Sequence, residues 1–203
     1  MNLRFVQFAF SSILGVLVSG CSALDALNVQ KPTATFRSAR LENVTADGLT
    51  ANFDIAVDNP NSFSVPLTTA QYKLALGGVQ VVDDQAKPDA AIPAQGSLPV
   101  TVPVRLNFQH LLSAEQAIAQ SGGNIPYDFD GALHFSPGKL PLAQDIKVPI
   151  HFKGTLPLRD ALTAVARDPS VLANPDARKV IELVLGKGML GGLLNRLERQ
   201  GNP

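Results

Sequence analysis

The chain has little of what marks many binding and catalytic proteins. Its 203 residues include one cysteine, no tryptophan and two tyrosines. One cysteine excludes an internal disulfide and any metal site built from several cysteines. The 17 basic and 17 acidic residues cancel and form no run of five like charges, so we expect no nucleic-acid partner. Hydrophobic residues make up 45% of the chain and charged residues 17%, a composition that predicts a folded protein.

The amino terminus has the pattern of a secretory signal. An apolar stretch from Phe5 to Val18 follows Arg4, the only charged side chain among residues 1–21. The stretch is short for a bilayer about 30 Å thick and is typical of the hydrophobic part of a signal peptide. It leads into Val18-Ser19-Gly20-Cys21, which resembles the lipobox of bacterial lipoproteins.

The lipobox resemblance implies cleavage before Cys21 and attachment of acyl chains such as palmitate to that residue. We therefore expect a signal peptide over residues 1–20, and a lipidated cysteine with a linker over residues 21–31. The alternative is an ordinary secretory peptide or a short membrane anchor with an incidental cysteine. Lipoproteins retained in the inner membrane resemble one another in having Asp after the cysteine, where this chain has Ser22. We therefore expect an anchor in the outer membrane that faces the periplasm.

From Lys31 onward the dominant hydrophobic period is two, which is typical of strands with one buried face. The longest alternating set runs from Leu98 to Phe108. About seven strands are expected, near residues 33–43, 51–58, 72–76, 79–81, 98–108, 127–135 and 146–152. With Gly- and Pro-rich turns between them, these strands predict an all-β protein with an antiparallel β-sandwich.

Two regions carry helical patterns. Ser113 and Gln116 have the spacing of a capping box, which predicts one short helix over residues 113–120. In the extension over residues 156–203, Asn174-Pro175-Asp176 predicts a helix start, as does Asp168-Pro169. Its apolar face consists of Val180, Ile181, Val184 and Leu185, and then Met189, Leu190, Leu193, Leu194 and Leu197. We expect this face to pack on the sandwich; the alternatives are a segment that lies on the membrane or one that docks a partner.

The motif Asn59-Pro60-Asn61 is the centre of a family resemblance. The segment LTANFDIAVDNPNSFSVPLTTAQYKLALGGVQVV, residues 49–82, resembles the WHy domain (water stress and hypersensitive response) of type 2 late-embryogenesis-abundant proteins. The resemblance extends over residues 32–155. It implies a fibronectin-III-like antiparallel sandwich with one short helix, and a role in desiccation or other water stress.

The chemistry of this hallmark favours a structural turn over a ligand contact. Asn59 can hydrogen-bond to the backbone two residues on, and Pro60 removes a strand donor and fixes φ. Asn61 tolerates a left-handed backbone, and none of the three residues is a nucleophile or a general base. We therefore expect the turn to end one strand and redirect the chain.

Catalytic and metal-binding patterns are weak. His110, His134 and His151 are each isolated, with no second histidine or cysteine at ligand spacing. The pairs Asp54 with Asp58 and Asp128 with Asp130 each lie on one side of a strand. We interpret them as solvent-facing residues rather than a cation site or a glycosidase pair. The chain has no Gly-x-Ser-x-Gly nucleophile motif.

One literal match to a dinucleotide-binding motif is rejected. Residues 186–191 read Gly-x-Gly-x-x-Gly, and residues 180–185 could pass for the strand before it. However, only 12 residues follow Gly191, which leaves no room for the acidic residue and the further βα units of that fold.

Together these patterns predict a non-enzymatic, membrane-anchored periplasmic lipoprotein with no catalytic residue, no metal and no cofactor. Its expected partners are the membrane, through lipid on Cys21, and client proteins or lipid. The resemblance implies protection in desiccation or water stress. The alternatives are a module that binds lipid or another apolar ligand, and a scaffold partner in envelope assembly.

Overall fold

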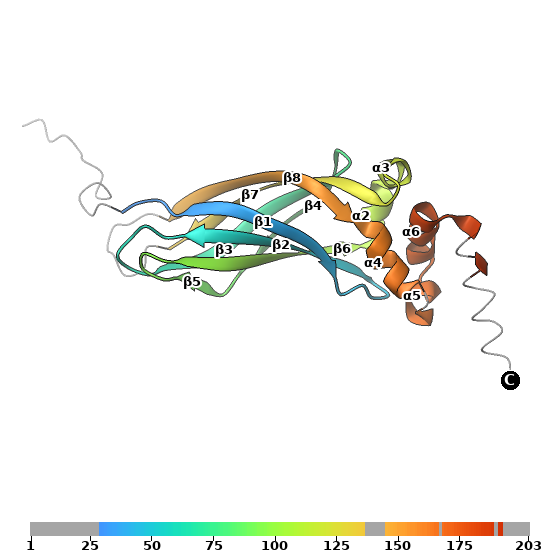
Figure 1. Cartoon of the computed structure of the whole chain (residues 1–203), viewed down its shortest axis with the longest axis horizontal. Coiled ribbons are helices and arrows are strands. Elements are labelled where there is room, and N and C mark those ends of the chain that lie inside the picture. Colours follow the sequence, from blue (N-terminus) through green and yellow to red (C-terminus); the bar gives the residue numbers. More distant parts are fainter. Residues whose placement is uncertain (1–28, 137–144, 167, 189–190, 193–203) are drawn as a thin grey trace, which may run out of the picture.

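The computed structural model describes residues 29–136, 145–166, 168–188 and 191–192 (Figure 1). The expected signal peptide over residues 1–20 and the lipidated Cys21 lie outside the described residues. So do Met189, Leu190, Leu193, Leu194 and Leu197 of the expected apolar face.

The described residues form an antiparallel β-sandwich, as the hydrophobic period predicts. One sheet has the strand order β1-β2-β6, formed by β1 (Thr33–Glu42), β2 (Gly48–Asp58) and β6 (Ser97–Asn107). The other has the order β4-β3-β7-β8, and β5 pairs with β3 beside this path. Its strands are β3 (Val65–Leu76), β4 (Val79–Ala86), β5 (Ala90–Ile92), β7 (Asn124–Phe135) and β8 (Ile146–Pro157). The sequence predicts about seven strands; the additional one, β5, has three residues, too few for a period to show.

Aromatic rings fill the space between the two sheets. Phe129 and Phe152 stack with ring centroids 4.4 Å apart, and Phe53 lies 4.6 Å from Phe129. On the side where β1 and β8 meet, Phe36 stacks on Phe152 at 4.4 Å and closes the sandwich. The expected alternation is confirmed here, because the inward residues of β2 and β6 are buried while their neighbours face outward.

The predicted helix over residues 113–120 is wrong in its start and continuity. The structure has two short helices, α2 (Phe108–Ser113) and α3 (Glu115–Gln120). Asn107 caps α2, since its side-chain oxygen accepts a hydrogen bond from the His110 backbone N–H at 2.8 Å. Ser113 ends α2 instead of starting a helix, and its hydroxyl donates to the His110 carbonyl at 2.7 Å. Burial of Phe108 and Leu111 places the start earlier than the capping-box pattern indicates.

The extension forms a helical cap on one end of the sandwich, made of α4 (Leu158–Val165), α5 (Pro169–Ala173) and α6 (Pro175–Leu185) (Figure 1). Asn174 starts α6 as predicted, because its side-chain oxygen accepts from the Asp176 backbone N–H at 2.8 Å. α6 lies against α2, α3 and α4, and Val180 and Ile181 are fully buried. The described part of the extension therefore shares one core with the sandwich.

Among the described residues, no helix has the length and apolar character needed to cross a membrane.

Candidate functional site

The Asn-Pro-Asn turn contains the buried polar side chains of the described structure. Asn59 is 2% exposed and Asn61 is 4% exposed, and the described residues contain no other buried polar or charged residue. A buried amide is costly unless its donors and acceptors are paired, so each hydrogen bond of this pair contributes to the fold.

Asn59 joins two loops at the end of the sandwich opposite the helical cap. Its Nδ2 donates to the Phe63 carbonyl at 2.7 Å and to the Pro93 carbonyl at 3.0 Å. Its Oδ1 accepts from the Asn61 backbone N–H at 3.0 Å, the contact two residues on that the sequence indicates. The Asn59 side chain therefore closes its own turn and fixes the connection between β5 and β6.

Asn61 binds the segment that leads into β1. Its Oδ1 accepts from the Gln30 backbone N–H and its Nδ2 donates to the Gln30 carbonyl, both at 2.8 Å. Its own carbonyl accepts from the Gln95 backbone N–H at 2.8 Å. Asn61 does not use the left-handed backbone that asparagine tolerates; Gln95 does, with φ of 48°. No local sequence signal identifies Gln30 or Gln95 as partners of this turn.

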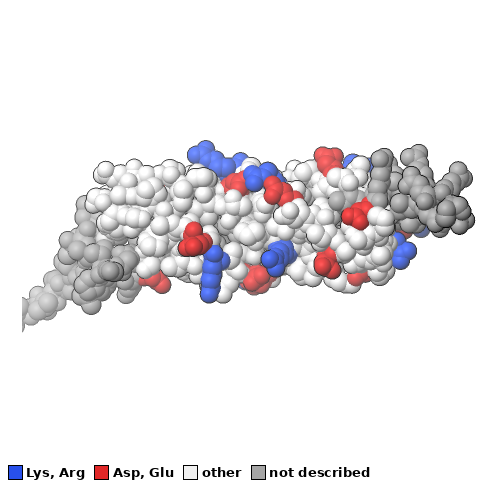
Figure 2. All heavy atoms as spheres, turned by 90° about the horizontal axis from the view of Figure 1, so that it is seen from below, with Lys and Arg blue, Asp and Glu red and all other residues white. Residues whose placement is uncertain are grey.

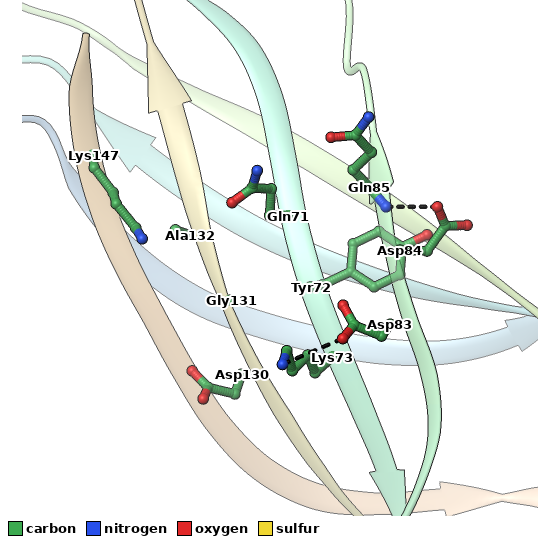
Figure 3. A pocket seen from close by; sticks show the side chains of 10 residues that line it. All are labelled: Gln71, Tyr72, Lys73, Asp83, Asp84, Gln85, Asp130, Gly131, Ala132 and Lys147. Carbon is green, nitrogen blue, oxygen red and sulfur yellow. Dashed lines mark hydrogen bonds and ion pairs between the residues drawn. The ribbon is translucent and has the colours of Figure 1, made fainter. Parts of the chain in front are cut away.

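One open hollow lies on the outer face of the larger sheet, over β4, β3 and β7 (Figure 3). It encloses about 640 Å³ and includes Gln71, Asp130 and Lys147 in its lining. Lys73 and Asp83 also line it and form an ion pair at 3.2 Å. The hollow is polar with charges of both signs, which fits the solvent-facing interpretation of Asp130.

A second hollow of about 770 Å³ lies between β4 and β6, which are not paired with each other. Its lining combines the buried Leu49 and Leu106 with the exposed Asp84 and Arg105. It also includes His110, whose Nδ1 is buried without a hydrogen-bond partner.

Tyr72 links the two sheets near this second hollow. Its hydroxyl donates to the Pro103 carbonyl of β6 at 3.4 Å. Burial raises the pKa of Tyr72; Asp84 raises it further, and Arg105 opposes the increase. Asp84 on β4 and Arg105 on β6 therefore act on the same phenol from the two strands that border the hollow.

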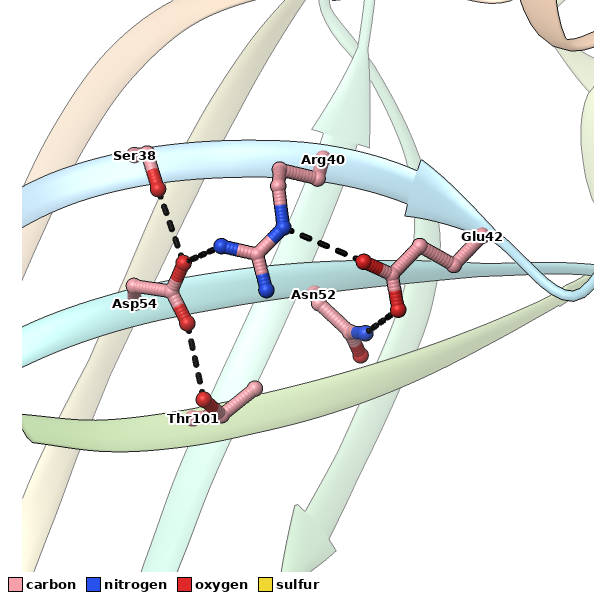
Figure 4. Close-up of polar contacts among 6 residues, drawn as sticks. All are labelled: Ser38, Arg40, Glu42, Asn52, Asp54 and Thr101. Atoms are coloured by element: carbon pink, nitrogen blue, oxygen red, sulfur yellow. Dashed lines mark hydrogen bonds and ion pairs between the residues drawn. The ribbon is translucent and has the colours of Figure 1, made fainter.

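A polar network covers the outer face of the smaller sheet. Figure 4 shows its members: Ser38, Arg40, Glu42, Asn52, Asp54 and Thr101. Asp54 accepts hydrogen bonds from the Thr101 hydroxyl at 2.7 Å and the Ser38 hydroxyl at 2.8 Å, and it pairs with Arg40. Partial burial tends to raise the pKa of Asp54, but these hydrogen bonds and the Arg40 charge outweigh it and lower the pKa. Because side chains of β1 and β6, on either side of β2, bind both oxygens of the Asp54 carboxylate, the network joins the three strands of the smaller sheet. Asp54 is therefore not a free ligand.

The other histidines and carboxylates are dispersed. Asp128 pairs with Lys153 at 2.6 Å and lies 3.5 Å from the His151 Nδ1. His134 contacts Gln71 at 3.1 Å. In the ranges that the structure describes, no group of three or more His, Cys, Asp or Glu residues could hold a metal ion. The glycine motif at residues 186–191 follows helix α6 instead of a strand, against the dinucleotide-binding interpretation.

The described surface offers little apolar area. Val79, at the start of β4, is 41% exposed and is the one large hydrophobic side chain that the described residues leave exposed. A surface of this kind lacks the apolar patch that marks many permanent protein interfaces.

Comparison with known proteins relates this sandwich to plant stress proteins. A family model described as "Late embryogenesis abundant protein" matches residues 54–150. A desiccation-related protein of Arabidopsis thaliana is 24% identical over 131 residues, which are 64% of this chain and 76% of that protein. Late embryogenesis abundant protein Lea14-A of Gossypium hirsutum is 23% identical over 131 residues, 64% of this chain and 84% of that one.

A solved structure supports the fold. The solution structure of an Arabidopsis thaliana protein is 20% identical in sequence and covers 63% of this chain and 82% of its own, with a TM-score of 0.51. The matched residues 54–150 lie within the sandwich and exclude the helical cap. Over most of the sandwich, the chain is therefore similar in sequence to proteins described as late embryogenesis abundant or desiccation-related.

Proposed function

We propose that the protein is a non-enzymatic, membrane-anchored periplasmic lipoprotein that protects the cell envelope during desiccation or water stress. The observation that carries the stress role is the family match over residues 54–150, together with relatives named for desiccation and late embryogenesis. The anchor on Cys21 rests on the lipobox resemblance of residues 18–21, and its place in the outer membrane rests on Ser22 after the cysteine.

The surface indicates how such protection would work. A protein that holds unfolding clients through apolar contacts needs a sizeable exposed apolar patch, and the described surface has one exposed large side chain, Val79. The outer faces of the two sheets instead carry hydroxyls, amides and charges of both signs (Figures 3 and 4). We therefore propose that the sandwich acts through polar contacts with client proteins or envelope surfaces as water is withdrawn.

Survival of cells after drying and after hyperosmotic shock tests the proposal. Deletion of the gene should lower survival, and the wild-type gene should restore it. A Cys21→Ala variant should remain unlipidated, as measured by incorporation of labelled palmitate, and should restore survival poorly. Unchanged survival of the deletion strain would count against the stress role, whereas full rescue by the unlipidated variant would count only against the need for the anchor.

The hollow between β4 and β6 favours a second candidate function, the binding of a lipid or another small apolar ligand. Its volume of about 770 Å³ is in the range of small-molecule sites, and it combines Leu49 and Leu106 with the polar Arg105. Native mass spectrometry of gently purified protein tests this function. A ligand adduct that is lost when the exposed Arg105, which lines the hollow, is replaced by alanine would support it, and a persistently ligand-free mass would exclude it.

A further inference from the structure

The chain enters the sandwich at a defined point. Val29 is partly buried against the core, and Asn61 holds both backbone groups of Gln30 at 2.8 Å. This point lies at the end of the sandwich opposite the helical cap (Figure 1). Because Asn61 is itself buried and bound to Asn59, the entry point is fixed to the body of the domain.

Covalent geometry limits how far this end can lie from a lipid on Cys21. Nine Cα–Cα steps separate Cys21 from Gln30, so their greatest separation is about 32 Å in any conformation. The 11 residues of β2 span about 36 Å between the entry end and the helical end. The end of the sandwich that contains Gln30 therefore lies within about 32 Å of the lipid in any orientation. The distance of the helical cap from the lipid depends on the orientation of the domain.

The two ends and the sides differ in charge. The loops Asn59–Ser64 and Ile92–Gly96, here called the uncharged end, contain no charged residue, and the exposed Lys31 and Asp58 lie at their margin. They belong to longer runs without charge, residues 59–72 and 90–104. Figure 2 shows a broad uncharged surface on this side of the molecule and charges over the middle and the helical end of the same face.

The sides would lose more hydration than the uncharged end if they faced a membrane. The outer sheet faces carry exposed ion pairs, Lys73 with Asp83 and Lys153 with Asp128. Removal of charged groups from water is much more costly than removal of amides and hydroxyls that are already paired. An end-on arrangement keeps these pairs in water.

We infer that the uncharged end faces the lipid surface that holds the anchor, and that helices α4 to α6 point away from it. This inference rests on the lipid anchor of the proposed function. It adds an orientation: Asn61 sets the point of attachment, and the helical cap is presented to the periplasm.

Energy transfer from the protein to the membrane tests the orientation. Two matched variants of the full-length lipidated protein, Ala94→Cys and Ala173→Cys, place a fluorescent label at the uncharged end and at the helical end. Both positions are exposed, and the Cys21 sulfur is blocked by its lipid in the mature protein. The labelled proteins are reconstituted into vesicles of phosphatidylethanolamine and phosphatidylglycerol that carry acceptor-labelled lipid.

Transfer should be several-fold more efficient from position 94 than from position 173. Equal transfer from the two positions would show a domain lying flat, and stronger transfer from position 173 would show the reverse orientation; either result overturns the inference. Flotation of the same vesicles tests separately whether the protein is anchored to the membrane. A protein that does not float with the vesicles lacks the anchor, and then the proposed membrane attachment falls together with the orientation.

Discussion

Replacement of Asn59 tests whether the buried amide pair stabilises the fold. Asn59→Ala removes donors to the Phe63 and Pro93 carbonyls and the acceptor for the Asn61 backbone N–H. A typical hydrogen bond contributes about 1 kcal/mol, and a buried group left unpaired costs about 1–3 kcal/mol. We therefore expect the free energy of unfolding to fall by about 2–4 kcal/mol, and the melting temperature of a chain of this size by about 5–15 °C.

Asn59→Asp is a sharper test, because it keeps the shape of the side chain and replaces the donor Nδ2 with an oxygen that accepts. A carboxylate at this position would face the Phe63 and Pro93 carbonyl oxygens, which the amide now contacts at 2.7 Å and 3.0 Å. At neutral pH this variant should be less stable than Asn59→Ala. It should recover in part in acid, because burial beside acceptors raises the pKa of a carboxyl and the protonated form can donate.

Thermal unfolding followed by circular dichroism, with the full-length protein in mild detergent, measures both effects. Asn124→Ala is the matched control, because Asn124 is exposed at the start of β7 and should change the stability by less than about 0.5 kcal/mol. If Asn59→Ala matched this control, or if Asn59→Asp were as stable as Asn59→Ala at neutral pH, the reasoning would be refuted.

Three further substitutions test other parts of the structure. Ile181→Ala should lower the free energy of unfolding by about 2–4 kcal/mol in urea titrations, because Ile181 is fully buried in the shared core, whereas the exposed Lys179→Ala should have little effect. Asp54→Asn should flatten the stability profile at low pH; the folded pKa of Asp54 is lowered, so its stabilisation is present above the unfolded pKa of about 3.9 and is lost as pH falls through the folded pKa. An unchanged acid profile would contradict the network. Gly131→Ala should destabilise the pairing of β3 with β7, because its Cβ would meet the backbone of the facing strand, while Gly188→Ala has open space and serves as the control in the same melting assay. Equal melting temperatures for the two glycine variants would show that the close approach at β7 is not important.

The sequence predicts the sheets well because each strand buries one face. In β6, Val100, Val102, Val104 and Leu106 are buried between exposed neighbours, so the period of two is complete. β4 is less regular, since the register shifts opposite Leu74 and leaves Val81 and Val82 both half-buried. A bulge of this kind depends on the pairing of strands and has no period of its own.

The site is only partly predictable, because its contacts join residues far apart in the chain. The bond within the turn from Asn61 to Asn59 follows from local chemistry, whereas Gln30 lies 31 residues from Asn61 and carries no signal of its own. The three partners of Asp54 likewise depend on the register of β1, β2 and β6. The capping-box prediction at Ser113 failed for the same reason, since burial of Phe108 and Leu111 in the fold set the start of the helix.

Because the cap and the sandwich share one core, a truncated sandwich is a poor test of which surface protects other proteins during drying. Val180 and Ile181 of the cap are fully buried, and so is Leu162. A sandwich that ended at residue 155 would therefore lose these contacts and expose Leu111 and Ile118, which are 1% exposed in the intact protein. Loss of protection in such a fragment could then reflect unfolding or aggregation as readily as loss of an active surface. Surface substitutions that keep the cap, on the outer faces of the sheets or at the uncharged end, separate these causes, because they change the surface that we propose contacts clients and leave the core intact.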